Sequence, residues 1–129
     1  MANKIETVAL LHPGNMGATI GAAAATSGAR VLWASKDRAS ATRRRAAQAK
    51  LIDAGDLPAM VRQSEVVLSV CPPHAAVEVA RAVAAEKFPG IYVDANAVSR
   101  ATAEEIGTIV SASGASFVDA FMRSVSANC

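Results

Sequence analysis

The clearest chemical motif of the chain is a glycine-containing turn that follows a short apolar run. Residues 7–11 are long enough for one buried strand, and they lead directly into His12, Pro13, Gly14, Asn15, Met16 and Gly17. This order resembles the dinucleotide-binding turn G-x-G-x-x-G, with His12 in place of its first glycine. Gly14 lets the backbone approach a pyrophosphate, and Gly17 lets the next helix pack closely on the strand. The helix N-terminus then offers free N–H groups to phosphate oxygens.

The residues after the second apolar run favour NADP over NAD. An acid at this position would bind the 2′-hydroxyl of the NAD ribose, but Ser35 stands there, with Lys36 and Arg38 close behind. A hydroxyl and two cations suit the 2′-phosphate of NADP. Two alternatives stay open: Ser35 caps the next helix, or Asp37 is the ribose-binding acid, displaced along the chain. The run 43–45 is either a solvated arginine face or supplies one further phosphate contact.

A third group of candidate residues follows two later apolar runs. Val70, Cys71 and Pro72 end one run, and Asn96 follows the other. Because the carboxyl ends of parallel strands meet at one edge of a sheet, we expect this group beside the first turn. Pro72 has no N–H to lose and can pack on the nicotinamide ribose. Asn96 either faces the nicotinamide or makes local backbone hydrogen bonds in a turn.

Other chemistry finds little support in the sequence. His12, Cys71 and His74 could converge at neighbouring strand ends, but two ligands three residues apart and one distant ligand are a weak metal signal. We therefore predict no metal site and name no catalytic residue. The sequence contains none of three common catalytic motifs: the phosphate-binding loop of nucleoside triphosphatases, the nucleophile elbow of hydrolases and the zinc protease motif.

The elements that must position these residues alternate along the chain. Apolar runs of strand length cover residues 7–11, 30–34, 65–70, 90–94 and 116–119, with a vestigial strand at 51–52. Helical patterns cover residues 14–27, 37–49, 57–63, 74–85 and 101–113, with Gly28 ending the first and Ser99 near the start of the last. This alternation predicts an α/β fold, a Rossmann-like doubly wound parallel sheet in a three-layer αβα arrangement.

Composition limits the remaining possibilities. The 129 residues predict one dinucleotide-binding domain over residues 1–119 and a C-terminal tail over 120–129, and 52% hydrophobic residues suffice for a core. A net charge of +2 does not indicate nucleic-acid binding. Two cysteines exclude a disulfide scaffold, and no apolar run is long enough for a membrane span. Residues 1–6 are unlike a signal peptide, so we expect a cytoplasmic protein.

These motifs together resemble the superfamily of 6-phosphogluconate and β-hydroxyacid dehydrogenases. Residues 8–17 are similar to its opening segment, which has the pattern G-x-G-x-M-G. Met16 and Gly17 match the last two positions of that pattern. Residues 66–76, 92–99 and 115–120 resemble its fourth strand and loop, its fifth strand and its sixth strand. The resemblance covers about residues 5–120. The chain departs from the pattern at Ser35, where members carry Arg, and at Arg100, where they carry Pro.

The resemblance implies an NADP-binding domain that positions the nicotinamide for hydride transfer, as in 3-hydroxyisobutyrate dehydrogenase-like enzymes. Because the family continues with a helical C-terminal domain, we hypothesise that the chain is a truncated relative, shortened by a frame slip near residue 120. None of the lysines, at positions 4, 36, 50 and 87, matches the catalytic lysine of the family. Enzyme activity of this chain alone therefore stays open.

Three functions follow from this resemblance. The first is an NADP-binding module that is inactive by itself. The second is a working oxidoreductase whose missing helical domain is supplied by a partner subunit. The third possibility is a degenerate, non-enzymatic interaction protein, in which apolar surface left by the missing domain drives self-association.

Overall fold

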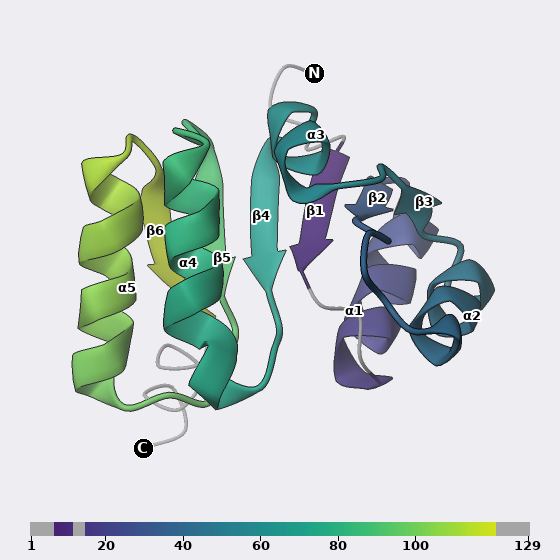
Figure 1. Ribbon diagram of the computed structural model, residues 1–129, viewed down its shortest axis with the longest axis horizontal. Helices are drawn as coiled ribbons and strands as arrows, with labels where there is room; N and C mark the ends of the chain where they lie inside the picture. Colours follow the sequence, from purple (N-terminus) through teal and green to yellow (C-terminus); the bar gives the residue numbers. More distant parts are fainter. Residues whose placement is uncertain (1–6, 12–14, 121–129) are drawn as a thin grey trace.

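The computed structural model describes residues 7–11 and 15–120, which alternate between strands and helices (Figure 1). The strands are β1 (Thr7–Leu11), β2 (Arg30–Trp33), β3 (Ile52–Asp53), β4 (Val66–Ser69), β5 (Ile91–Asp94) and β6 (Ser116–Asp119). The helices are α1 (Asn15–Thr26), α2 (Ser40–Gln48), α3 (Leu57–Arg62), the 3₁₀ turn η1 (Pro73–Ala75), α4 (Ala76–Ala85) and α5 (Arg100–Ala112).

All six strands form one parallel sheet in the order β3-β2-β1-β4-β5-β6. The chain builds outward from β1 in one direction, then crosses back to β4 and builds outward in the other. Strand order therefore reverses between β1 and β4, whose last residues, Leu11 and Ser69, are in register. This topology confirms the predicted Rossmann-like fold, because helices between successive parallel strands cover both faces of the sheet.

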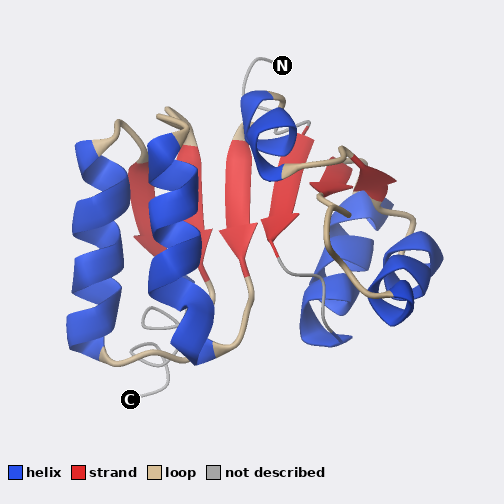
Figure 2. Ribbon diagram, in the orientation of Figure 1, coloured by secondary structure: helices blue, strands red, loops and turns tan. Residues whose placement is uncertain are grey.

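Alternation of side chains along the strands divides the core into two layers. In β1, Ala9 and Leu11 belong to one apolar cluster, together with Met60 of α3 and Ile106 of α5. Leu10 points to the other face, where α1 and α2 pack. Successive strand residues point to opposite faces, so one short strand contributes to both layers. Figure 2 shows α4 and α5 side by side in front of the sheet.

Several element ends follow from local chemistry, as predicted. Gly28, with φ at +103°, ends α1: its N–H donates to the Ala25 carbonyl, and the Ala29 N–H donates to the Ala24 carbonyl. This is a Schellman motif, in which glycine takes the left-handed position without steric cost. Ser99 is the N-cap of α5 and accepts a hydrogen bond from the Thr102 N–H at 3.1 Å.

Helix α2 corrects two expectations. It begins at Ser40, not at Asp37, because Asp37 has φ at +64°, which a right-handed helix does not accommodate. Its N-cap is Ala39, which makes no side-chain hydrogen bond, so Ser35 does not cap this helix. Residues 34–39, the β2 loop, therefore separate β2 from α2.

Within the described ranges, no helix combines the length and apolar character needed to cross a bilayer.

Candidate functional site

A cleft of about 510 Å³ opens beside the point where strand order reverses. Its size is typical of small-molecule sites. The residues that line it come from the end of β1, the β2 loop, α3 and its N-cap, and η1 with α4: Leu10, Leu11, Ala34, Lys36, Asp37, Arg38, Asp56, Leu57, Pro58, Met60, Ala75, Glu78, Val79 and Ala82. Ligands of open parallel sheets bind in such crevices at the carboxyl ends of the strands.

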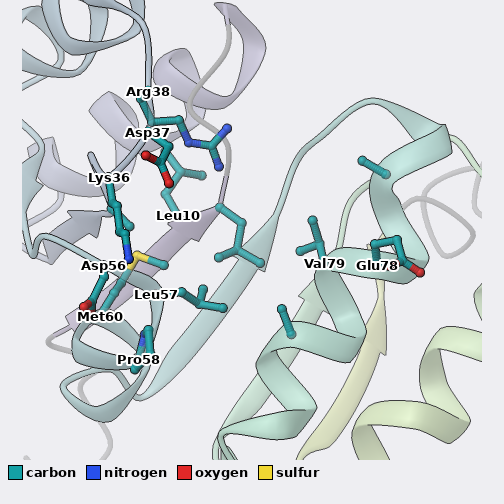
Figure 3. Close-up of a pocket in the computed structure, with 14 residues that line it drawn as sticks. Leu10, Lys36, Asp37, Arg38, Asp56, Leu57, Pro58, Met60, Glu78 and Val79 are labelled. Carbon is teal, nitrogen blue, oxygen red and sulfur yellow. The ribbon is translucent and has the colours of Figure 1, made fainter.

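One wall of the cleft is charged and the floor is apolar. Figure 3 shows Lys36, Asp37 and Arg38 in a row along the β2 loop, with Leu57 and Pro58 of α3 near them. Val79 and Glu78 of α4 lie across the cleft in the same view. All three charged side chains of the loop belong to exposed residues. Because Asp37 lines the same cleft as the two cations, the arrangement does not by itself separate NADP from NAD.

Internal hydrogen bonds define the shape of the β2 loop. The Arg38 N–H donates to the Ser35 carbonyl at 3.0 Å, which closes a turn with Asp37 in the left-handed region. Ser35 itself is buried, with 7% of its surface exposed. The turn directs Lys36 and Arg38 into the cleft, whereas Ser35 faces the protein. The sequence analysis placed Ser35, Lys36 and Arg38 in one cofactor-binding group. In the structure, Lys36 and Arg38 line the cleft and Ser35 does not.

The glycine-containing turn is described only in part. His12, Pro13 and Gly14 lie outside the described residues. Asn15 is the first residue of α1, Met16 is the second, and Gly17 is buried in its first turn. This turn of α1 contains no acidic residue, so no carboxylate opposes the positive end of the helix dipole there.

The third predicted group meets at the ends of β4 and β5. The Asn96 side chain accepts a hydrogen bond from the Cys71 N–H at 2.7 Å and donates to the Ser69 hydroxyl at 2.9 Å. Its own N–H donates to the Asp94 Oδ1 at 2.8 Å. Asn96 is buried, with 3% of its surface exposed. The structure therefore gives it both a local turn and a long-range bridge that holds the loop after β4.

The neighbours of this bridge are apolar or partly buried. Val70 is buried, while Cys71 and Pro72 are half-buried. Burial raises the pKa of the Cys71 thiol above its ordinary value, and the nearby Ser69 hydroxyl opposes this only in part. Cys71 is therefore a protonated thiol at neutral pH, which is a poor nucleophile and a poor metal ligand. These three residues are not among those that line the cleft.

Sequence reasoning missed the cleft-lining residues of α3, its N-cap and α4. Leu57 and Met60 were expected as part of a short helix, and Glu78 and Val79 as part of a longer one, while Asp56 was not singled out. Asp56 is the N-cap of α3, and its side chain accepts a hydrogen bond from the Ala59 N–H at 3.0 Å. An apolar helix face looks the same in sequence whether it borders a core or a cleft. No sequence signal distinguishes these residues from ordinary core positions.

A parallel sheet in this order, with a helix N-terminus after β1 and a cleft at the switch point, defines the class of NAD(P)-binding Rossmann domains. Within that class, the chain belongs to the family described as NADP oxidoreductase, coenzyme F420-dependent, whose model matches residues 7–98. No curated protein matches the chain.

Solved structures share the fold. One is the conserved protein MTH1747 of unknown function, reported as similar to 3-hydroxyacid dehydrogenases, with a TM-score of 0.80, 24% identity, and coverage of 88% of this chain and 42% of that one. The 3-hydroxyisobutyrate dehydrogenase of Mycobacterium tuberculosis, solved with L-serine, has a TM-score of 0.79, 24% identity, and coverage of 88% and 39%. The imine reductase variant of Myxococcus stipitatus with NAD⁺ has a TM-score of 0.71, 20% identity, and coverage of 88% and 39%.

The chain spans about two-fifths of the length of these structures. It is the NAD(P)-binding domain of a fold that continues in those proteins beyond the part they share with it.

Proposed function

We propose that the chain is the NADP(H)-binding domain of an oxidoreductase similar to β-hydroxyacid dehydrogenases and imine reductases. The observation that carries this proposal is the pair of cations, Lys36 and Arg38, on the wall of a cleft at the switch point of the sheet. The 2′-phosphate distinguishes NADP from NAD, and charge-assisted hydrogen bonds from such cations stabilise a phosphate. The description of the family as NADP oxidoreductases supports the same cofactor.

We assign candidate residues of the chain to each part of this cofactor. His12 to Gly17, including Asn15 and Met16, would hold the pyrophosphate at the start of α1. Lys36 and Arg38 would hold the 2′-phosphate, while Leu57 and Val79 border the apolar part of the cleft, which suits an adenine ring. Val70, Cys71 and Pro72, held in place by Asn96, would lie toward the nicotinamide. Bound NADP(H) supplies a hydride at C4 of the nicotinamide ring.

The domain positions the cofactor in this proposal, and other parts of the assembly bind the substrate. Support comes from the length of the solved relatives, of which the chain spans about two-fifths. A group that transfers the substrate proton, and most of the substrate pocket, would come from a further domain or a partner subunit. A hydroxyl or imine carbon is then the expected site of hydride transfer.

Calorimetric titration of the purified chain with NADPH and with NADH tests this proposal. We expect NADPH to bind more tightly. Lys36→Ala and Arg38→Ala should each weaken NADPH binding by about 10- to 100-fold, since a hydrogen bond to a charged group contributes about 1.5–3 kcal/mol. NADH binding should change little. Arg62→Ala is the matched control, because Arg62 is an exposed cation of α3 that does not line the cleft.

Two results would contradict the proposal. Absence of binding heat with both cofactors would show that this chain does not hold a dinucleotide. Equal losses of NADPH and NADH affinity in Lys36→Ala and Arg38→Ala would show that these cations do not read the 2′-phosphate.

A further inference from the structure

Helix α2 carries three consecutive arginines whose surroundings differ. The Arg43 guanidinium donates from Nη2 to the Ser35 carbonyl at 3.1 Å, so it reaches the β2 loop. Arg44 and Arg45 instead line a separate groove between α1 and α2, with Thr19 and Gln48. Successive helical residues are rotated by about 100°, which sends neighbours to different surfaces. Arg43 is therefore hydrogen-bonded to the β2 loop, whereas its neighbour Arg44 lines the separate groove.

The Ser35 carbonyl is the point at which the turn of the β2 loop is held. It accepts the Arg38 N–H at 3.0 Å from inside the turn and the Arg43 guanidinium at 3.1 Å from outside it. Asp37 between them lies at φ +64°, in the left-handed region, which costs Asp less than most other residues but still benefits from an external restraint. The bond from Arg43 is one such external restraint.

A second restraint acts on the same loop from the turn that follows β3. The Lys36 N–H donates to the Gly55 carbonyl at 3.0 Å, and the Gly55 N–H donates to the Asp53 Oδ1 at 2.8 Å. The Ser35 hydroxyl, the Gly55 N–H and the charge of Arg43 lower the pKa of Asp53 below its ordinary value. The positive charge of Arg43 is thus near enough to the Asp53 carboxylate to contribute to this lowering of its pKa.

We infer that Arg43 is a positioning residue that holds the β2 loop in the shape that presents Lys36 and Arg38 to the cleft. It thereby sets the preference for a phosphorylated over an unphosphorylated ribose. This inference rests on the proposed function for its effect on cofactor choice. Its structural part, that Arg43 restrains residues 35–38, is independent of the cofactor.

The binding test compares Arg43→Gln with Arg44→Gln by calorimetry of the full chain with NADPH and NADH. Both variants lose one positive charge from the same helix, so long-range electrostatic effects on an anionic cofactor are matched. We expect Arg43→Gln to weaken NADPH binding about tenfold more than NADH binding, and Arg44→Gln to leave the ratio of the two dissociation constants unchanged. Arg43→Lys keeps one donor for the Ser35 carbonyl and should restore most of the preference.

A second measurement tests the restraint without any cofactor. Amide hydrogen exchange of the free chain should be about tenfold faster at residues 36–38 in Arg43→Gln than in the original chain or in Arg44→Gln. Exchange in β4 and α5 serves as an internal check that both variants are folded. If Arg43→Gln proves unfolded, Arg43→Met carries the same comparison against Arg44→Met, because Met keeps the apolar stem and removes the donor to the Ser35 carbonyl.

The outcomes separate the two hypotheses. No NADPH binding by the original chain overturns the proposed function, and the exchange experiment then decides the role of Arg43 alone. Unchanged exchange at residues 36–38 in a folded Arg43→Gln overturns the inference. So does an equal change of the cofactor ratio in Arg43→Gln and Arg44→Gln, because it would trace the effect to charge rather than to position.

Discussion

Asp94 is a buried carboxyl group at the end of β5 whose two oxygens have different surroundings. Its Oδ1 accepts the Asn96 N–H at 2.8 Å, while its Oδ2 is buried and has no hydrogen-bond partner in the part of the chain that the structure describes. Burial raises the pKa of Asp94 above its ordinary value, and the negative charge of Asp119 acts in the same direction. The residue therefore costs stability when it is ionised, because an unpaired buried charge has lost its hydration.

Asp94→Asn should stabilise the protein at pH 7, by about 1 kcal/mol, the lower end of the cost of an unsatisfied buried polar group. A raised folded-state pKa gives stability that is complete below the ordinary carboxyl pKa and is lost as pH rises through the folded-state value. The gain from the amide should therefore shrink toward pH 4. Urea unfolding at pH 4 and pH 7 measures both values.

Asp53→Asn is the control, because we expect it to change the free energy of unfolding in the direction opposite to Asp94→Asn. The pKa of Asp53 is lowered, first by the Ser35 hydroxyl, so its ionised form stabilises the folded chain above the ordinary carboxyl pKa. This variant should lose stability at pH 7 and lose less at pH 4. A larger gain for Asp94→Asn at pH 4 than at pH 7 would contradict the assignment of Asp94 as a destabilised carboxylate.

At the scale of elements, the ends of the helices depend on single capping groups. The Ser99 hydroxyl accepts the Thr102 N–H at 3.1 Å and also donates to the Thr102 hydroxyl at 2.9 Å at the start of α5. Ile106 and Val110 on this helix are fully buried against the sheet. A cap at Ser99 thus supports the helix that packs on β6 and beside α4.

Ser99→Ala should lower the free energy of unfolding by about 1 kcal/mol, the typical cost of removing an N-cap side chain. Ser111→Ala in the same helix is the matched control, since Ser111 is exposed near the C-terminal end and a helix-interior alanine is favourable. Denaturant unfolding of the two variants gives the difference. Equal stabilities would show that the cap of α5 contributes nothing measurable.

At the scale of the whole molecule, the cleft joins the two halves of the sheet. The β2 loop and α3 belong to the half that β1 begins, and α4 belongs to the half that β4 begins. The large exposed apolar side chains in the described residues, Ile52 and Ile91, lie on β3 and β5, which three strands separate. They do not form one patch, so they give no specific support to a self-association function.

A cofactor that contacts both walls should stabilise both halves together. At 100 times its dissociation constant, NADPH should raise the unfolding free energy by about 2.7 kcal/mol. Trp33, the single tryptophan of the chain, is buried in β2 and reports on the first half, while circular dichroism reports on all helices. We expect both probes to shift together in denaturant titrations. A shift in Trp33 fluorescence alone would contradict binding across the cleft.

The sequence by itself determined the order and type of the elements and the place of the first candidate turn. The apolar periodicity and the residues Gly28 and Ser99 act over short stretches of the chain. They therefore predict the bounds of the strands and the ends of the helices within a few residues, and the alternation of these elements predicts the Rossmann topology. The end of β2 was also predicted as a place where cations gather. These are local signals, because side-chain period and capping depend on neighbours in the chain.

Only the tertiary structure decided which of these residues face the cleft and what holds them there. The late start of α2, the bond from Arg43 to Ser35, and the contact between Lys36 and Gly55 depend on how α2 and β3 pack beside β2. The places of the other lining residues, such as Leu57 and Val79, depend on how α3 and α4 pack on the sheet. Such contacts join residues of different elements, and docking geometry, rather than local propensity, sets their distances.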